Sequence, residues 1–136
     1  MNIHNGEQLL ETMRAYQVPC LLAAAADLDI FEMLIQAPQT AKDVAAMSGS
    51  DLRAVTILLD ALAAVKIIAK EGRQYSVSPE LAPYLSKGSP QSVMAMLRHQ
   101  ANCLRRWARL PWTIHSGKPD LPGPSILGEE ADNQSF

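Results

Sequence analysis

The middle of the chain carries a helical period of apolar residues. Between residues 41 and 65 these residues recur three or four positions apart, which predicts two amphipathic helices, 41–47 and 51–65, separated at Gly49. Thr40 is placed to cap the first helix and Ser50 the second. The positions expected to face the core are Val44, Ala45, Met47, Val55, Leu58, Leu59, Leu62 and Val65.

The period then changes from helical spacing to alternation. Ile67–Ala69 is a β-prone run, Glu71–Arg73 has turn composition, and Tyr75–Ser78 alternates as a returning strand. Two helices followed by a β-hairpin form the order of a winged helix. The hairpin is predicted to be the wing.

Three helices are predicted before this unit. The first, residues 6–17, carries an apolar stripe, and a lone helix of this length is marginal unless that stripe packs on its own fold or on another copy of the chain. The second starts near Pro19 and is apolar on all sides, which predicts neighbours around it. The third spans residues 28–35, with Ile30, Phe31 and Leu34 as core candidates.

After the wing, a brief helix is predicted in residues 79–85, and a long one opened by Pro90 over residues 91–110. The long helix has two apolar stripes, although packing on one small domain needs only one. The first consists of Val93, Leu97, Ala101, Leu104 and Ala108, and the second of Met94 or Met96, Cys103, Trp107 and Leu110. A symmetry mate or a further domain would cover the second. Gly117–Pro124 has linker composition, and residues 128–136 show no pattern for a terminal element.

These patterns predict a mainly α fold. Residues 1–116 are expected to form a winged-helix-like domain with a short β-hairpin wing, extra N-terminal helices and a long C-terminal helix, and residues 117–136 a linker. A length of 136 residues with 48% hydrophobic side chains suits one domain with a modest core.

Charge argues against the usual role of a winged helix, which is to place its second helix in the DNA major groove. Residues 40–80 contain five basic and five acidic side chains, and the whole chain has a net charge of −2. Because phosphate neutralisation dominates DNA affinity, a neutral unit is a poor DNA reader. The basic residues of the long helix, Arg98, Arg105, Arg106 and Arg109, are interpreted as pairing with acids across an interface rather than as a nucleic-acid strip.

Candidate chemistry is sparse. Cys20 and Cys103 are predicted to be reduced, buried thiols, and His99 with Cys103 supplies only two of the ligands that a zinc site needs. No phosphate-binding glycine motif or catalytic triad order occurs in the sequence. The longest apolar run, residues 18–26, is too short for a membrane anchor, and the N-terminus lacks a signal peptide pattern, so a cytoplasmic setting is expected.

The order of several segments resembles the N-terminal dimerisation domain of S-adenosylmethionine (SAM)-dependent O-methyltransferases of the plant-caffeate and bacterial-antibiotic type. The similarity extends from about Leu10 to Lys118. It rests on the segments AADLDIF (25–31), TAKDVA (40–45), LLDAL (58–62), YSVS (75–78) leading into Leu81–Ala82, and Trp112 to Pro119. One departure is Val65–Lys66, where such proteins usually have glycine before the first wing strand.

The resemblance implies a homodimer with interlocked N-terminal helices and no nucleic-acid or membrane partner. It implies an interface that includes Leu9, Leu10, Met13, Leu21 and Leu22. It also implies that a small, aromatic or polyketide-like acceptor would be walled by Met13, Tyr16, Met96, Cys103 and Trp107. The motifs of the family's catalytic half are absent, so SAM is expected only for a full-length enzyme and no catalytic, cofactor or metal residue is assigned. A DNA-binding regulator and a free-standing adaptor remain the alternatives.

Overall fold

The computed structural model describes residues 1–134. Helices account for most of these residues, together with three short strands. The helices are α1 (Gly6–Arg14), α2 (Gln17–Asp27), α3 (Ile30–Gln36), α4 (Ala41–Ser48), α5 (Leu52–Ala64), α6 (Ala82–Leu85), α7 (Met94–Trp107), α8 (Leu110–Ser116) and α9 (Glu129–Gln134). The strands are β1 (Gln39–Thr40), β2 (Ala69–Glu71) and β3 (Gln74–Ser76). The predicted mainly α, winged-helix-like class is confirmed.

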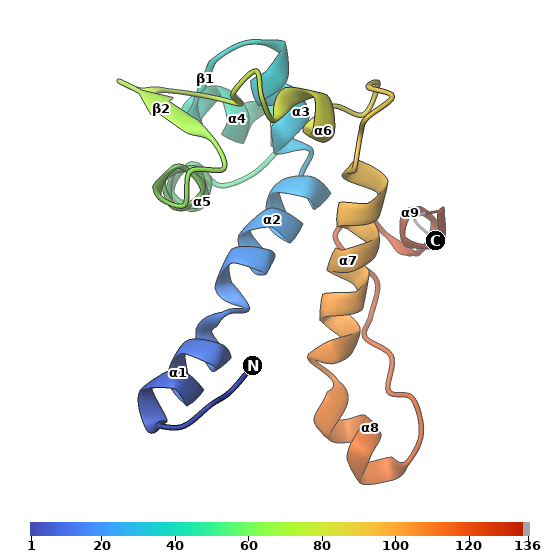
Figure 1. Cartoon of the computed structure of the whole chain (residues 1–136). Coiled ribbons are helices and arrows are strands. Elements are labelled where there is room, and N and C mark those ends of the chain that lie inside the picture. The colour runs from blue at the N-terminus through green and yellow to red at the C-terminus, as the bar shows by residue number, and fades with distance from the viewer. Residues whose placement is uncertain (135–136) are drawn as a thin grey trace.

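A winged-helix unit forms the end of the molecule drawn at the top of Figure 1. Helices α3, α4 and α5 pack beside an antiparallel sheet of order β1-β3-β2, in which Gln39 faces Tyr75 and Lys70 also faces Tyr75. The predicted hairpin is therefore present, but the third strand, β1, was not predicted. Its two residues are too few to show an alternating pattern.

The core lies inside this unit and extends to the end of α2. Its largest fully buried side chains come from α3, α4 and α5, as the apolar spacing predicted. They are Phe31, Ile30, Leu34, Leu59, Leu62 and Val44. Met47 and Val65, however, are 50% and 40% exposed, so their predicted inward orientation is wrong. Each lies near the C-terminal end of its helix, beyond the part that neighbouring elements cover.

Local capping defines the two central helices. Thr40 accepts from the Asp43 backbone N–H at 3.2 Å, and Asp43 Oδ2 accepts from the Thr40 N–H at 3.1 Å, which makes a capping box. Gly49 ends α4 with φ 63°, as predicted. The cap of α5 is Asp51, whose Oδ1 accepts from the Ala54 N–H at 2.8 Å. The prediction that Ser50 caps α5 is therefore wrong by one residue.

At the entry to the wing, Lys66 takes the place where similar proteins usually have a glycine. Helix α5 ends at Ala64, and Lys66 adopts φ 63°, a left-handed conformation that glycine adopts at lower cost. Ile68 is buried, and β2 starts at the next residue, Ala69. The predicted strand over residues 67–69 is thus shifted towards the turn.

Helices α2 and α7 pack side by side and project from the winged-helix unit, with α1 and α8 at their far ends (Figure 1). Several predicted helices have different bounds: α1 ends at Arg14 rather than at residue 17, α3 begins at Ile30 rather than at residue 28, and α6 begins at Ala82 rather than at residue 79. Helix α2 begins at Gln17 rather than at Pro19, which occupies the first turn where its missing N–H costs little. The predicted helix 91–110 is divided into α7, which starts at Met94, and α8, which has a proline in its first turn.

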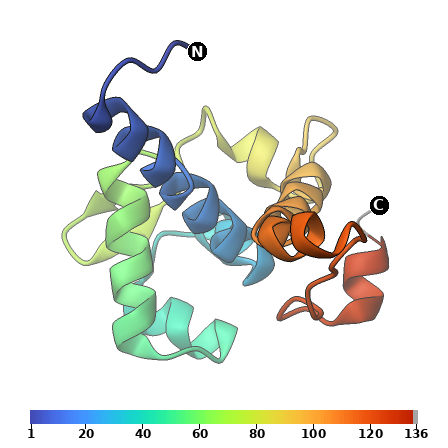
Figure 2. The ribbon, with the colours of Figure 1, turned by 90° about the horizontal axis from the view of Figure 1, so that it is seen from below.

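The C-terminal segment also differs from its prediction. Residues 129–134 form α9 and pack against α7, whereas no element was expected there. Seen from below, α7 lies between α2 and α9 (Figure 2). Over residues 1–134, no helix has the length and apolar character needed to cross a membrane.

Candidate functional site

Helix α1 presents an apolar stripe that none of residues 1–134 buries. Asn5 caps the helix by accepting from the Gln8 N–H at 2.9 Å, so α1 is well formed, yet it has no buried residue. The exposed large side chains on this stripe and the turn after it are Leu9, Leu10, Met13 and Tyr16, with exposed fractions of 51% to 70%. Contiguous exposed apolar stripes of this kind are typical of interaction surfaces.

Burial increases along α2 from its beginning to its end. Gln17 to Cys20 are exposed, Leu21 and Leu22 are half-buried against the core, and Ala25 and Ala26 are fully buried. The expectation of neighbours on all sides therefore holds only for the second half of the helix. Cys20 is exposed and Cys103 is half-buried, both as free thiols, so the prediction of two buried thiols is wrong.

An apolar groove of about 260 Å³ separates the start of α2 from α7. Its α2 wall consists of Pro19, Leu22 and Ala23, and its α7 wall includes Leu97, Leu104 and Trp107. The first predicted stripe of the long helix thus faces α2. The second stripe stays largely uncovered, because Met96 and Trp107 are 57% and 70% exposed while Met94 alone is buried.

A second apolar cavity, of about 400 Å³, lies between the end of α7, α8 and the loop that follows. Arg109 connects α8 to the loop that follows it. Its Nε donates to Asp120 Oδ2 at 2.6 Å, and its guanidinium lies 4.1 Å from the centre of the Trp112 ring. The Asp120 N–H also donates to Thr113 Oγ1 at 3.1 Å. These contacts fasten residues 117–121 to α8, so this part of the predicted linker has a defined position.

The structure brings together only part of the predicted acceptor wall. Cys103 and Trp107 line both apolar cavities. Met96 is exposed on α7, where its sulfur lies 3.8 Å from Gln100 Nε2. Met13 and Tyr16 project from α1 and the turn after it and do not line either cavity. Within one chain these five residues do not form one site.

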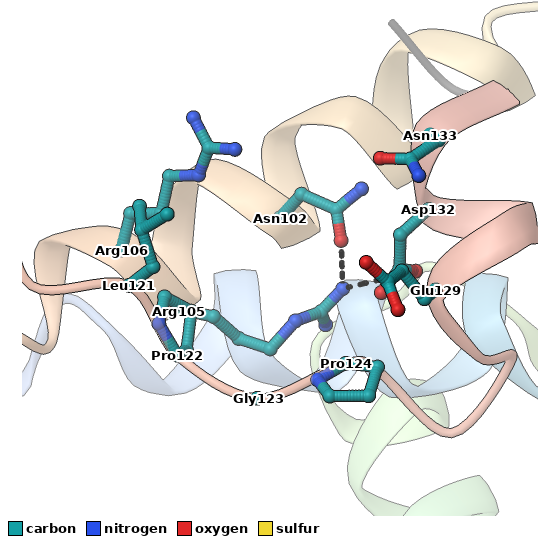
Figure 3. A pocket seen from close by; sticks show the side chains of 10 residues that line it. All are labelled: Asn102, Arg105, Arg106, Leu121, Pro122, Gly123, Pro124, Glu129, Asp132 and Asn133. Atoms are coloured by element: carbon teal, nitrogen blue, oxygen red, sulfur yellow. Dashed lines mark hydrogen bonds and ion pairs between the residues drawn. The ribbon is translucent and has the colours of Figure 1, made fainter.

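A third pocket, of about 260 Å³, is polar and lies between α7 and α9 (Figure 3). Asn102, Arg105 and Asp132 meet in it. Asn102 is one of the two buried polar side chains that the structure describes, the other being Asp27. Burial works to raise the pKa of Asp132, but the hydrogen bonds from Ser125 and the charge of Arg105 outweigh it and hold that pKa below its usual value.

Three arginines of the long helix and its end pair with acids of the same chain. Arg98 lies 3.3 Å from Asp29, Arg105 lies 3.1 Å from Asp27, and Arg109 pairs with Asp120. The interpretation of pairing with acids is confirmed for these three, but the pairs are internal rather than across an interface.

Helix α5, which a DNA-binding winged helix would place in the major groove, carries a carboxylate that is paired with the wing. Asp60 on α5 accepts from Lys70 Nζ and from the Tyr75 hydroxyl, each at 2.6 Å. The hydrogen bond from Lys70 and then that from Tyr75 lower the pKa of Asp60, and the bond to Asp60 raises the pKa of Lys70. Lys70, one of the basic residues of the wing hairpin, is thereby paired with a carboxylate and has less charge to offer a phosphate group.

Cys103, which lines both apolar cavities, has an ionisable neighbour on its own helix. Cys103 Sγ lies 3.6 Å from His99 Nε2 on the same helix. Among residues 1–134, no group of three His, Cys, Asp or Glu side chains is placed to hold a metal ion. The arrangement is suited to packing and to apolar binding.

Comparison with known proteins agrees with this geometry. The family model of the O-methyltransferase dimerisation domain matches residues 10–87. Rat acetylserotonin O-methyltransferase is 31% identical over 112 residues, which are 81% of this chain and 26% of that protein. The N,N-dimethyltransferase OxyT of Streptomyces rimosus is 28% identical and covers 95% of this chain and 38% of its own length.

Solved structures give the same result. An O-methyltransferase family protein from Burkholderia thailandensis superposes with a TM-score of 0.74 and 26% identity over 86% of this chain and 35% of that one. Human N-acetylserotonin methyltransferase in complex with SAM has a TM-score of 0.71 and 25% identity, over 86% and 37%. The chain thus spans between a quarter and two fifths of these relatives. It belongs to the O-methyltransferase dimerisation domain family.

Proposed function

We propose that this chain is the homodimerising part of a SAM-dependent O-methyltransferase and contributes a wall to the pocket of its acceptor. The observation that carries the proposal is α1, a capped helix with an apolar stripe and no buried residue. The groove between α2 and α7 supplies an apolar surface of the same character. Burying both surfaces in a second copy would remove them from water, which is the usual driving force for a stable dimer.

For the acceptor we propose a small aromatic or polyketide-like compound with a hydroxyl group, in keeping with the apolar cavities that Cys103 and Trp107 line. Met13 and Tyr16 would join this wall from the partner copy, since they reach neither cavity in their own chain. The proposed setting is the cytoplasm, without a nucleic-acid or membrane partner.

The described residues do not fit a SAM site. The sheet is antiparallel with strands of two or three residues, and its glycine, Gly72, lies in the wing turn. A glycine-rich turn between a parallel strand and a helix, which cradles such cofactors, is absent from residues 1–134. We therefore propose that SAM binds to another part of a longer protein, and we assign no catalytic residue here.

The dimer is tested by sedimentation velocity on the wild-type chain and on two variants that place the same charge on opposite faces of α1. Met13→Lys puts a lysine in the apolar stripe, and Glu11→Lys puts it about half a turn away. We expect a dimer for the wild type and Glu11→Lys and a monomer for Met13→Lys. A monomeric wild type at tens of micromolar, or a dimeric Met13→Lys, would contradict the proposal.

The enzyme context is tested by the intact mass of the polypeptide in the cells that make it. A mass of roughly 35–40 kDa, which allows a second domain of ordinary size, would support the methyltransferase. A mass of 14.8 kDa would contradict it, because this chain alone has that mass.

A further inference from the structure

Arg105 lies where three helices meet. Its Nη1 donates to Asp27 Oδ2 on α2 at 3.1 Å. Its Nη2 donates to Asn102 Oδ1 on its own helix, α7, and lies 4.0 Å from Asp132 Oδ1 on α9 (Figure 3). One planar guanidinium thus contacts α2 and α9 at once, a geometry that the single ammonium of lysine cannot reproduce.

The α2 side of this contact is an interior ion pair. Asp27 is 8% exposed, and a carboxylate this deeply buried requires a cation or several donors. Arg105 supplies that cation from the last turn of α7, and Asp27 in turn restricts the orientation of the guanidinium. Helix α2, whose first residues, 17–20, are exposed, therefore helps to fix the position of Arg105.

The α9 side of the contact closes a loop. Asp132 Oδ2 accepts from the Ser125 N–H at 2.7 Å, and Asp132 Oδ1 accepts from the Ser125 hydroxyl. The Gly128 N–H donates to the Ser125 carbonyl at 3.0 Å, and Gly128 adopts φ 89°. Residues 125–132 therefore form a closed turn whose carboxylate faces Arg105 across the polar pocket.

We propose that Arg105 is a positioning residue that links the C-terminal turn and α9 to α2. Through this link, the orientation of the proposed dimerisation helices, α1 and α2, would determine the orientation of the segment that leads out of the domain. In the longer enzyme proposed above, this contact would orient the following domain relative to the dimer, and only that consequence rests on the proposed function. The contacts of Arg105 with Asp27 and Asp132 lie within this chain and do not depend on the proposed function.

Hydrogen exchange of the chain 1–136 tests the link. In Arg105→Gln we expect the amides of Ser125, Gly128 and Asp132 to exchange about two- to fivefold faster, the range for a partly exposed ion pair, while amides of α5 keep their wild-type rates. Arg98→Gln is the matched control. Arg98 also lies on α7, and its guanidinium donates to the Ala26 carbonyl near the end of α2 and to Asp29 just after it.

Arg105→Gln leaves Asp27 buried without its cation, so the double variant Asp27→Asn/Arg105→Gln is measured beside it. It removes both charges together and keeps the expected loss of protection in residues 125–132. Unchanged exchange there in the double variant would overturn the proposal. Equal loss in Arg98→Gln would also overturn it, because looser packing of α2 on α7 would then be sufficient. Sedimentation reports dimer formation separately, so failure of the dimer and failure of the link are distinguishable.

Discussion

The winged-helix unit and the projecting helices use the same apolar residue types in opposite ways. In the unit, Phe31 and Leu59 are fully buried among residues of α3, α4 and α5. In the projecting helices, Met13 on α1 and Trp107 on α7 are each 70% exposed. The unit completes its core within one chain, whereas the projecting helices carry apolar surface that only another surface can cover. The residues that hold the fold are therefore separate from the exposed apolar surface, which we propose binds a second copy of the chain.

The largest effect is expected for Phe31→Ala in the core. Removing a fully buried aromatic ring leaves a cavity and should lower the free energy of unfolding by about 3–5 kcal/mol. Trp107→Ala, also an aromatic truncation, should change it by less than about 0.5 kcal/mol because the ring is exposed. Denaturant unfolding at a protein concentration where the chain is monomeric measures both. Equal losses would remove the distinction between the two regions.

Two glycines with left-handed φ extend the comparison. Gly49, φ 63°, joins α4 to α5 inside the unit, and Gly117, φ 69°, follows α8. An added Cβ meets open space at both sites, so the cost is that of the left-handed conformation itself, about 1–2 kcal/mol. Gly49→Ala should lower the free energy of global unfolding by that amount, and Gly117→Ala should mainly loosen α8. Denaturant unfolding curves measure the effect of Gly49→Ala, and hydrogen exchange in residues 110–117 measures that of Gly117→Ala.

The helix caps sharpen the contrast further. Thr40→Ala removes the cap of α4 in the unit and should cost about 1 kcal/mol of global stability. Asn5→Ala removes the equivalent cap of α1, and its loss should fray α1 in the monomer without moving the midpoint of global unfolding. Thermal unfolding, followed by circular dichroism, distinguishes the two. A shift of the global midpoint by Asn5→Ala would show that α1 unfolds together with the core.

The smallest effect concerns pH. The folded-state pKa of Asp60 lies below its ordinary value of 3.8, first because of Lys70 and then Tyr75. A depressed carboxylate pKa contributes stability above pH 3.8 that is lost as pH falls through the lower, folded-state value. Asp60→Asn should therefore destabilise the chain slightly at neutral pH and reduce the loss of stability in the acid range. Denaturant midpoints measured from pH 2 to 7 would show an unchanged acid slope if Asp60 made no such contribution.

Sequence reasoning succeeded where the signal is local. The helical spacing of Phe31 and Leu34 identified core positions, and Thr40 and Gly49 defined the bounds of α4, because caps and amphipathic periods depend on residues within one or two turns. It was wrong for Ser50, where an adjacent Asp51 competes for the same cap, and for α9, whose six residues have too little periodicity to show a helix.

For the candidate site, the residue types were predictable but their grouping was not. Cys103 and Trp107 meet at two cavities, while Met13 and Tyr16 lie elsewhere in the same chain. Periodicity identifies the apolar face of a helix, but it does not show whether that face is buried within its own chain or against a second chain. The interior pairing of the arginines was likewise hidden, since Asp27 and Arg105 are 78 residues apart.

The sequence by itself determined the helical class, the winged-helix order and the chemistry available on each helix face, because each depends on short-range spacing and on side-chain type. Only the tertiary structure decided which faces are covered, since burial depends on the docking of α7 on α2 and on the bounds of both helices. That docking buries Asp27 beside Arg105, brings Asp132 within 4.0 Å of the same guanidinium and leaves α1 exposed. Long-range contact of this kind is a property of the folded chain as a whole.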